Sequence, residues 1–456
     1  MTDLLATPRH VHLVGVGGAG MSGLARILLV RGHTVTGSDQ RDGRTLAELR
    51  VLGAHIAVGH HADHLGDAEI VVTSTAVPAD NPEVLAAVAR GCTAMRRAEM
   101  LAALMAGEHA VLIAGTHGKT TTTSMAVVAL QAAGRDPSFA IGGSLNESGT
   151  NAHAGTDGTF VAEADESDRS FLVYRPDLAV VTNVELDHPD EFGDEADVDA
   201  AFDAFLARRP AGAPALLCRD DDGARRLAER CEAPVRTYGI EPGSDVRLML
   251  DEERGHRIRI GGEDAAPLRL TVPGRHNLVN ATAALAVCHE LGADVAAAAE
   301  GLARFTGAAR RFQVLGAAAG VTVVDDYAHH PTELRVTLAA ARSRAEARVV
   351  LVVQPHRYSR TRRFGAELGR AAAAADHVIV TDVFGSSEAP VPGVSGRLVA
   401  DAATDAGAVV EYVPHLVDVA DAVLAQVRAG DLVLITGAGD VTQVGPTVLA
   451  RLTGGG

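Results

Sequence analysis

The chain contains no tryptophan and a single lysine, and aromatic residues make up only 3% of its 456 residues. Proteins that bind single-stranded nucleic acids use aromatic side chains as stacking platforms and a positive surface to attract the phosphates. This chain has few such platforms, and its formal net charge is −17. The composition therefore argues against nucleic acid as a partner.

Cysteine and long apolar runs are also scarce. The four cysteines lie far apart and form no CxxC pair, so neither a zinc site nor a disulfide framework is indicated. No apolar run reaches the roughly 18 residues that cross a membrane, and the N-terminus lacks the apolar core of a signal peptide. We expect a soluble cytoplasmic protein without membrane insertion, and its length predicts about three domains.

The single lysine, Lys119, lies in the segment GTHGKTTT at residues 115–122. An apolar run at 111–114 precedes this segment, and residues 123–133 follow it without proline or glycine. A buried strand, a glycine turn and a helix N-terminus together wrap backbone N–H groups around phosphate oxygens. In such a loop the lysine binds the β- and γ-phosphates, and the Thr120 hydroxyl is a ligand of Mg²⁺. The complete Walker A pattern has a glycine where Ile113 stands, so the loop is a shortened variant.

Lysine at this position is informative because arginine supplies the positive side chains everywhere else in the chain. A planar guanidinium does not fit the place of a compact ammonium inside a phosphate loop. The sequence therefore predicts an ATP site whose loop residues are Gly115, Thr116, His117, Gly118, Lys119, Thr120 and Thr121.

A second glycine motif, GVGGAG at residues 15–20, lies between an expected strand at His10–Val14 and an expected helix at Met21–Val30. Asp39 ends the next strand, 24 residues after the first glycine. This pattern is typical of dinucleotide binding, with the acidic residue on a ribose. Because the same turn accepts any diphosphate at its helix N-terminus, the motif alone leaves NAD and other nucleotides open.

Three nearby histidines, His60, His61 and His64, suggest a metal site. No cysteine or close carboxylate pattern completes a ligand set around them. We therefore interpret this segment as a solvated turn.

Polar clusters follow several of the remaining expected strands, at the edge where open α/β sheets bind their ligands. The segment EADESD at 163–168 supplies the hard oxygen ligands that Mg²⁺ needs beside a triphosphate. The segment NVELDH at 183–188 ends in His188, which we expect to be functional. Paired arginines in HRYSR at 356–360 suit a carboxylate or a phosphate.

Because strands alternate with helical stretches, we predict parallel sheets with right-handed crossovers.

Two further segments carry polar groups. The segment GRHNLVN at 274–280 is expected to form a turn before a helix at Ala281–Leu291, and its two carboxamides suit a purine edge. The segment DDYAHHPTE at 325–333 follows an expected strand at Val321–Val324, with Pro331 at a helix start.

Together these motifs resemble those of the Mur ligases: GVGGAGMSGLA (15–25), GTHGKTTT, EADESD, NVELDH, GRHNLVNA, RRFQ (310–313), DDYAHHPTE and HRYSR. They occur in the family order over nearly the whole chain. The resemblance implies three α/β domains. These are a Rossmann-like N-terminal domain at 1–108 that binds UDP, a central P-loop ATPase-type domain with a parallel sheet at 109–305, and a Rossmann-like C-terminal domain at 306–456 that binds an amino acid.

The resemblance further implies an enzyme of peptidoglycan precursor synthesis that uses ATP and Mg²⁺ or Mn²⁺. The chain is most like the member that joins L-alanine to the lactyl carboxylate of UDP-N-acetylmuramate through an acyl phosphate. A relative that adds a recycled tripeptide to the same sugar nucleotide stays as an alternative. Dehydrogenases and P-loop switch proteins are alternatives from other classes. The sequence leaves monomer and homodimer open.

The same resemblance implies the site residues. The sugar nucleotide would contact Gly15, Gly17, Gly18, Ala19, Gly20, Met21, Ser22, Asp39, Ser74 and Thr75. Beyond the phosphate loop, ATP would contact Asn277, Asn280, Arg311 and Asp326. The amino acid would contact Tyr327, His329, Arg357 and Arg360. The metal ligands would be Thr120, Glu163 and His188, and the catalytic residues would be Lys119, His188 and Arg311.

Overall fold

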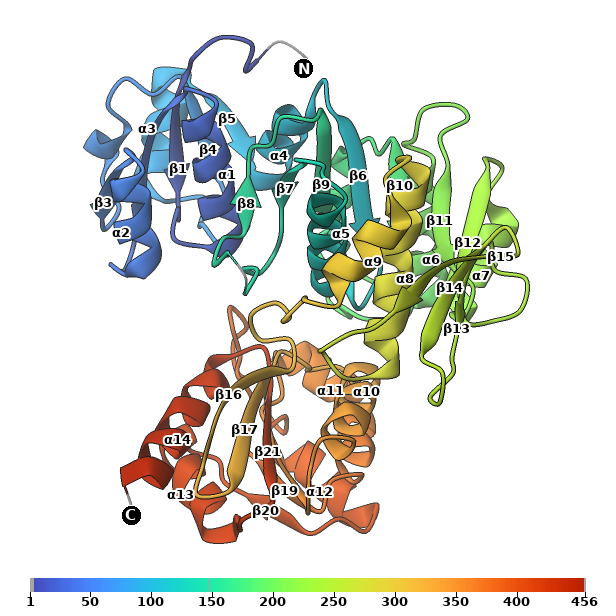
Figure 1. Cartoon of the computed structure of the whole chain (residues 1–456). Helices are drawn as coiled ribbons and strands as arrows, with labels where there is room; N and C mark the ends of the chain where they lie inside the picture. The colour runs from blue at the N-terminus through green and yellow to red at the C-terminus, as the bar shows by residue number, and fades with distance from the viewer. Residues whose placement is uncertain (1–3, 147, 455–456) are drawn as a thin grey trace. The chain divides into compact units, whose positions relative to one another are not determined.

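The computed structural model describes residues 4–146 and 148–454. Within these residues the chain forms three β-sheets flanked by helices (Figure 1). The chain divides into two compact units. The first contains the residues up to 184, with 198–269 and 280–304, and includes the N-terminal and central sheets. The second contains residues 185–197, 270–279 and those from 305 on, and includes the C-terminal sheet.

The N-terminal sheet has five parallel strands in the order β3-β2-β1-β4-β5, which is the order of a nucleotide-binding α/β fold. The central strand β1 is buried from Val11 to Val14, so both of its faces are covered, as is usual for parallel strands. The elements are β1 (His10–Val14), α1 (Ala19–Val30), β2 (Thr34–Asp39), α2 (Arg44–Val51), β3 (His55–Val58), η1 (Ala62–Leu65), β4 (Ile70–Thr73), α3 (Pro82–Arg90), β5 (Thr93–Arg96) and α4 (Arg97–Met105).

The central sheet has ten strands in the order β15-β14-β13-β12-β11-β10-β6-β9-β7-β8. The strands from β13 to β7 pair in parallel, whereas β14, β15 and β8 join antiparallel. The elements are β6 (His109–Ala114), α5 (Lys119–Ala132), β7 (Ser138–Ala140), β8 (Ala152–His153), β9 (Thr159–Glu163), η2 (Ser170–Val173), β10 (Leu178–Val181), α6 (Glu195–Leu206), β11 (Ala215–Cys218), α7 (Asp222–Arg230), β12 (Val235–Gly239), β13 (Val246–Met249), β14 (His256–Ile260), β15 (Glu263–Leu268), α8 (Arg275–Glu290) and α9 (Val295–Leu302).

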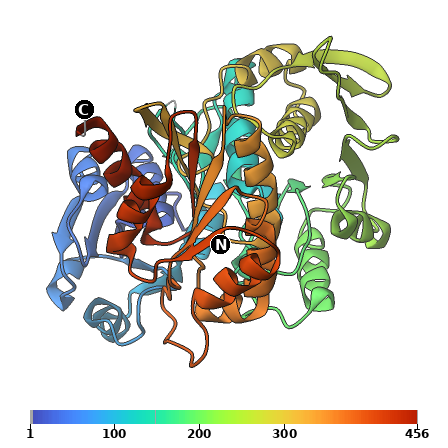
Figure 2. The ribbon, with the colours of Figure 1, turned by 90° about the horizontal axis from the view of Figure 1, so that it is seen from below.

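The C-terminal sheet has the order β16-β17-β21-β18-β19-β20, with β16 antiparallel to β17 and the other pairs parallel. Helices lie on both sides of its strands (Figure 2). The elements are β16 (Gln313–Ala318), β17 (Val321–Asp326), α10 (Pro331–Arg342), β18 (Val349–Val353), α11 (Tyr358–Ala372), β19 (His377–Val380), α12 (Arg397–Asp405), β20 (Val410–Tyr412), α13 (Leu416–Gln426), β21 (Leu432–Thr436), η3 (Asp440–Gln443) and α14 (Val444–Gly454).

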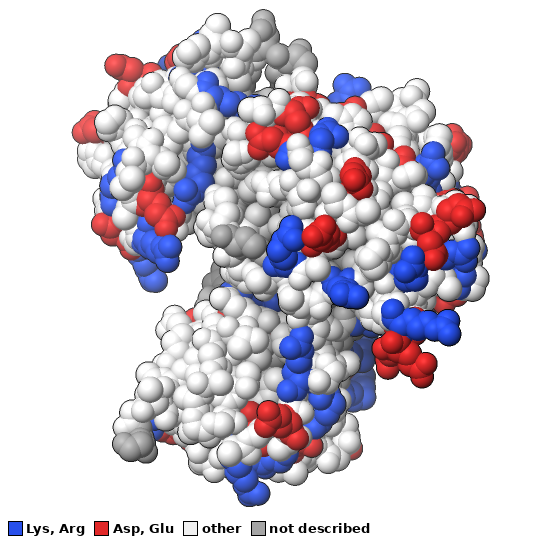
Figure 3. Space-filling model, viewed as in Figure 1, with Lys and Arg blue, Asp and Glu red and all other residues white. Residues whose placement is uncertain are grey.

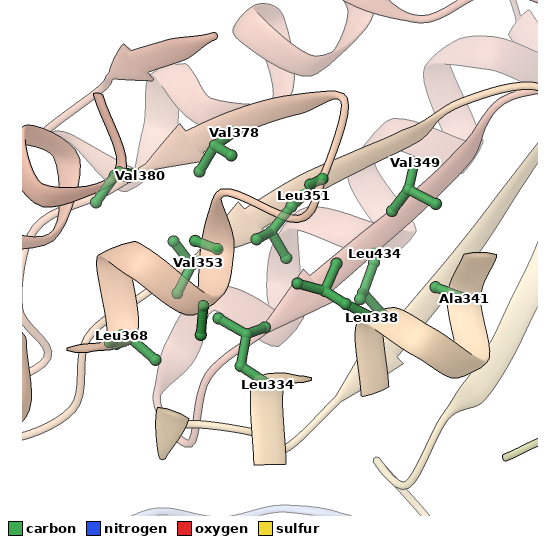
Figure 4. Packing of buried hydrophobic residues seen from close by; sticks show 14 of the residues in the cluster. Leu334, Leu338, Ala341, Val349, Leu351, Val353, Leu368, Val378, Val380 and Leu434 are labelled. Atoms are coloured by element: carbon green, nitrogen blue, oxygen red, sulfur yellow. The ribbon is translucent and has the colours of Figure 1, made fainter. Parts of the chain in front are cut away.

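Strand β18 illustrates how this sheet is buried on two faces. Its odd-numbered residues, including Leu351, pack with Leu334 and Leu338 of α10 and Leu368 of α11 (Figure 4). Its even-numbered residues, Val350 and Val352, belong to a second cluster with residues of α13 and α14. Because successive side chains of a strand point to opposite faces, a continuous apolar run supplies both clusters.

Most predicted elements are present, with two differences. The turn predicted at GRHNLVN is wrong: helix α8 begins at Arg275, so Asn277 and Asn280 lie on its first turns. The stretch 275–280 has no proline or glycine to stop a helix. Packing therefore outweighs the lower helix propensity of its asparagines, and the helix begins earlier than predicted. The antiparallel strands β8, β14, β15 and β16 also depart from the predicted parallel arrangement.

Charged side chains of both signs are interspersed on the face drawn in Figure 3. In the part of the chain that the structure describes, no helix is both long enough and apolar enough to cross a membrane.

We predict that Leu351→Ala lowers the free energy of unfolding of the second unit by about 2–5 kcal/mol, because it leaves a cavity in a closed core. Leu351 is fully buried, whereas Val417 on α13 is 84% exposed, so Val417→Ala should cost about 0.5 kcal/mol or less. Calorimetry of both variants provides the measurement. Equal, small shifts would contradict the assignment of this core.

Candidate active site

The phosphate loop begins at Gly115, directly after β6. Its φ is 133°, and a Cβ at this position would lie 2.0 Å from Thr182 Oγ1, so only glycine fits. The loop passes into helix α5 at Gly118, which is the N-cap of that helix. A Cβ on Gly118 would lie 3.1 Å from Asn280 Oδ1, which places Asn280 beside the loop.

Two residues after β10 fix the path of the loop. The His117 N–H donates to Asn183 Oδ1 at 2.8 Å, and the Thr116 N–H donates to the Asn183 carbonyl at 3.1 Å. The His117 carbonyl accepts from Thr182 Oγ1 at 2.6 Å and from Asn183 Nδ2 at 3.0 Å. Neither Thr182 nor Asn183 is among the site residues predicted from the sequence. The sequence feature that could have indicated this role is their position directly after β10, the strand that pairs with β6.

Lys119 lies within this loop and is largely buried. Its Nζ donates to the Gly115 carbonyl at 2.8 Å and to Glu166 Oε2 at 2.8 Å, and it lies 3.6 Å from Asp165 Oδ1. Burial alone would lower the pKa of Lys119, but the carboxylates of Glu166, Asp165 and Glu163 raise it above its usual value. The ammonium is therefore charged at neutral pH.

Glu166 is the carboxylate in direct contact with the lysine, and no feature of EADESD distinguishes it from the other carboxylates of that segment. Its side chain is 2% exposed. Burial raises the pKa of Glu166 to about 7, although the Lys119 ammonium acts in the opposite direction. The short motif could not show which of its four carboxylates meets the lysine, because that depends on the path of the chain after β9.

Thr120 and Glu163, two of the predicted metal ligands, lie together. Thr120 Oγ1 is 3.1 Å from Glu163 Oε2, and Glu163 Oε1 accepts from the Gly142 N–H at 2.6 Å. A hydroxyl and a carboxylate beside a phosphate loop form a hard oxygen donor set, which fits Mg²⁺. His188 belongs to the second unit, so its part in metal binding stays a prediction.

The N-terminal glycine turn is held by the end of β2. The Gly15 and Val16 N–H groups donate to the Ser38 carbonyl at 2.8 and 3.0 Å. The Gly17 N–H donates to Asp39 Oδ2 at 2.9 Å, and a Cβ on Gly17 would lie 2.8 Å from that oxygen. Asp39 thus holds the turn itself, which precedes the first turn of α1. This arrangement suits a diphosphate.

The loop after β4 lies next to this turn. A Cβ on Gly15 would be 3.5 Å from Val77 Cγ2, and the Val77 N–H closes a turn onto the Ser74 carbonyl at 3.1 Å. Ser74 and Thr75 therefore follow the strand beside β1, at the edge where the glycine turn lies.

The second unit brings together the residues predicted to bind the amino acid. His329 Nδ1 is 2.9 Å from the Tyr327 carbonyl, and the rings of His329 and His356 are 5.6 Å apart. Arg360 is buried and donates to both oxygens of Asp187, at 2.8 and 3.2 Å. Arg357 is more accessible and donates to Asp190 at 2.6 Å.

Burial sets the charges in this cluster. Burial alone would raise the pKa of Asp187, but the Arg360 guanidinium holds it well below its usual range. Burial lowers the pKa of His329 to about 4 and that of His356 to about 3. Both imidazoles are therefore neutral at pH 7, and the arginines supply the positive charge.

Arg311 and Asp326 lie close to this cluster in the second unit. The Arg311 guanidinium lies 5.0 Å from the centre of the Tyr327 ring. Asp326 is buried and accepts from the Phe312 and Ala328 N–H groups at 2.7 and 2.8 Å. Burial raises the pKa of Asp326 to about 6. The predicted contacts of both residues with ATP stay predictions.

Asn277 also belongs to the second unit and is buried. Its Nδ2 donates to the Pro273 carbonyl at 2.6 Å, so the side chain closes the start of α8. Its contact with a purine likewise stays a prediction.

The two glycine turns and the three sheets define a three-domain α/β nucleotide-binding protein. Three family models match consecutive stretches of it. They are the Mur ligase family, catalytic domain, at residues 10–109, the Mur ligase middle domain at 113–288, and the Mur ligase, glutamate ligase domain, at 310–439. These matches cover most of the chain, and the chain belongs to the Mur ligase family.

Several relatives match over nearly their whole length. The UDP-N-acetylmuramate–L-alanine ligase of Saccharopolyspora erythraea is 50% identical, over 99% of this chain and 94% of that protein. The ligase of the same name from Mycolicibacterium smegmatis is 48% identical, over 99% and 97%. The solved UDP-N-acetylmuramate-alanine ligase of Thermotoga maritima has a TM-score of 0.79 at 29% identity, over 97% and 99%. A murein peptide ligase from Psychrobacter arcticus has a TM-score of 0.73 at 25% identity, over 97% and 98%.

We predict that Lys119→Arg lowers kcat for phosphate release from ATP by about 100- to 1,000-fold, because the larger planar group displaces the loop or the γ-phosphate. Arg304→Lys, the reverse exchange at an exposed position in the turn after α9, should leave kcat unchanged. Turnover and sugar-nucleotide affinity are measured on the same folded preparation. Turnover of Lys119→Arg within about fivefold of the wild type would show that the lysine does not act inside the loop.

Proposed function

We propose that this chain is a UDP-N-acetylmuramate–L-alanine ligase, which joins L-alanine to the lactyl carboxylate of the sugar nucleotide at the expense of ATP in peptidoglycan precursor synthesis. The observation that carries the proposal is the Lys119 loop, in a chain about half identical over nearly its full length to ligases of that name. The reaction belongs in the cytoplasm, where ATP and the sugar nucleotide are available.

The chemistry explains why ATP is needed. A carboxylate is a poor electrophile, because resonance and its negative charge both repel an amine. A lactyl carboxylate oxygen attacks the γ-phosphorus, the bond to the β-phosphate oxygen breaks, and an acyl phosphate and ADP form. The amine of L-alanine then attacks the acyl carbon. The tetrahedral intermediate loses phosphate, the nitrogen loses its extra proton, and an amide remains.

This chain supplies positive charge where two anions must meet. Lys119 would bind the phosphates in the loop, and Arg311 would add a second cation. Thr120, Glu163 and His188 would hold Mg²⁺ or Mn²⁺. The metal, when bound, neutralises phosphate charge. The remaining ATP-binding residues of this proposal are Gly115, Thr116, His117, Gly118, Thr121, Asn277, Asn280 and Asp326.

The two other substrates would bind at the remaining clusters. The sugar nucleotide would bind the N-terminal turn through the residues from Gly15 to Ser22, with Asp39, Ser74 and Thr75. The α-carboxylate of alanine would bind Arg357, with His329, Tyr327 and Arg360 around it. The proposed domains are residues 1–108 for the sugar nucleotide, 109–305 for ATP and 306–456 for the amino acid.

Addition of a recycled tripeptide is the nearest alternative, because a murein peptide ligase shares the fold. Its sequence identity is 25%, against 48–50% for the alanine ligases of S. erythraea and M. smegmatis. Phosphate release with L-alanine, compared with release with the tripeptide, separates the two activities.

We predict strict coupling between substrates. Phosphate release should require ATP, a divalent metal and UDP-N-acetylmuramate together, and L-alanine should raise it sharply. A coupled phosphate assay that omits each component in turn makes the measurement. Equal release without the sugar nucleotide would favour a P-loop switch protein, and release dependent on the tripeptide would favour the recycling ligase.

We predict that Arg357→Ala raises the KM for L-alanine by about 30- to 150-fold, the effect of losing one charge-assisted bond to a carboxylate. The KM for ATP should be nearly unchanged. Arg362 lies on the same helix, is exposed and has no assigned role, so Arg362→Ala is the matched control. A rise in the KM for ATP alone would assign Arg357 to the nucleotide.

A further inference from the structure

The histidines near residue 60, which the sequence suggested as a solvated turn, surround a buried carboxylate. Glu83 lies on the first turn of α3 and its side chain is fully buried. Its Oε1 is 2.9 Å from His64 Nδ1 and accepts from the His61 N–H at 3.1 Å. Its Oε2 accepts from Ser38 Oγ at 2.5 Å and lies 3.4 Å from His12 Nε2.

These contacts keep Glu83 ionised in the interior. Burial alone would raise its pKa, but the groups that donate to it, His12 first, lower the pKa to about 2. A buried charge is tolerated when hydrogen bonds replace its hydration. Here the donors come from β1, from β2 and from the turn before β4. Glu83 therefore joins three segments that are far apart in the sequence.

Ser38 connects this buried carboxylate to the nucleotide turn. Ser38 is itself fully buried, and its hydroxyl donates to Glu83 while its carbonyl accepts from the Gly15 and Val16 N–H groups. The next residue, Asp39, accepts from the Gly17 N–H. The path from Glu83 to the turn thus passes through one residue and hydrogen bonds of 2.5 to 3.0 Å.

We propose that Glu83 is a positioning residue for the sugar-nucleotide site, which acts through Ser38 to hold the Gly15–Gly20 turn in the geometry that accepts a diphosphate. The proposal rests on the proposed function of this turn in binding UDP-N-acetylmuramate. Glu83 does not touch the substrate. Its carboxylate fixes the end of β2, and the end of β2 fixes the backbone N–H groups of the turn.

Glu83→Gln tests the proposal because it keeps the shape and changes the hydrogen bonding. A carboxamide has one acceptor oxygen, and its NH₂ group would face donors that now point at a carboxylate. We expect the KM for UDP-N-acetylmuramate to rise about 10- to 100-fold. The KM values for ATP and L-alanine should stay within about twofold, and kcat at saturating substrates should be retained.

Two further variants show whether the effect passes through Ser38. Ser38→Ala removes the hydroxyl and keeps the carbonyl that holds the turn, and it should also raise the KM for the sugar nucleotide. The double variant should be no worse than Glu83→Gln alone, because both changes break the same link. Additive effects would overturn the route through Ser38.

Glu48→Gln is the matched control. Glu48 is a partly exposed carboxylate on α2, a helix beside the same N-terminal sheet, and it is paired with Arg26 and Arg44. Its substitution should leave all three KM values unchanged. If Glu83→Gln does not fold, Ser38→Ala decides the test, and an unchanged KM for the sugar nucleotide in that variant overturns the proposal.

The outcomes also separate this proposal from the proposed function. Wild-type protein that releases phosphate only with UDP-N-acetylmuramate, beside a Glu83→Gln variant with the same KM, overturns the positioning role alone. If the Glu83→Gln variant has a lower kcat but unchanged KM values, less of the preparation is folded while the geometry of the turn is kept. This result also overturns the positioning role. Wild-type protein that needs no sugar nucleotide overturns the proposed function and this inference with it.

Discussion

The charge on one buried side chain, Lys119, is the constraint on which the central domain depends. An ammonium in the protein interior is costly unless acceptors and counter-charges surround it. The Gly115 carbonyl and Glu166, each at 2.8 Å, supply the direct contacts. The neighbouring carboxylates keep the lysine charged, so a fixed cation is in place before any phosphate arrives. Such preorganised charge is the main resource of an enzyme that must bring a carboxylate and a triphosphate together.

The two nucleotide turns of the first unit are held in the same way. In each, a glycine turn follows a strand, and residues at the end of a neighbouring parallel strand, or directly after it, fix the turn. Ser38 and Asp39 hold the N-terminal turn, whereas Thr182 and Asn183 hold the phosphate loop. A turn held by hydrogen bonds from a buried strand keeps its N–H groups aimed at a ligand. Because the turn is already ordered, it loses less conformational entropy when the ligand binds. This explains why polar residues at these strand ends, although they are not on the helices that follow the turns, are needed to hold the two sites in shape.

The sequence predicts the parts of this arrangement that depend on neighbouring residues. Strand β1 is an apolar-rich run before a glycine turn, and its predicted bounds, His10–Val14, are confirmed, because such a run has few other places in a fold. The phosphate loop follows from one lysine among glycines. The contacts of Glu166 with Lys119 and of Glu83 with Ser38 could not be predicted. They depend on how segments far apart in the sequence meet, and no local pattern distinguishes these carboxylates from their neighbours.

In the proposed reaction the sugar-nucleotide carboxylate, and not water, attacks the γ-phosphorus of ATP. The most direct measurement uses UDP-N-acetylmuramate with ¹⁸O in both lactyl carboxylate oxygens, together with ATP, Mg²⁺ and L-alanine, followed by mass analysis of the released phosphate. We expect each phosphate released with amide formation to carry one ¹⁸O atom, since the oxygen that attacked phosphorus leaves with it. Phosphate without ¹⁸O, formed at the same rate as the amide, would contradict the acyl-phosphate route.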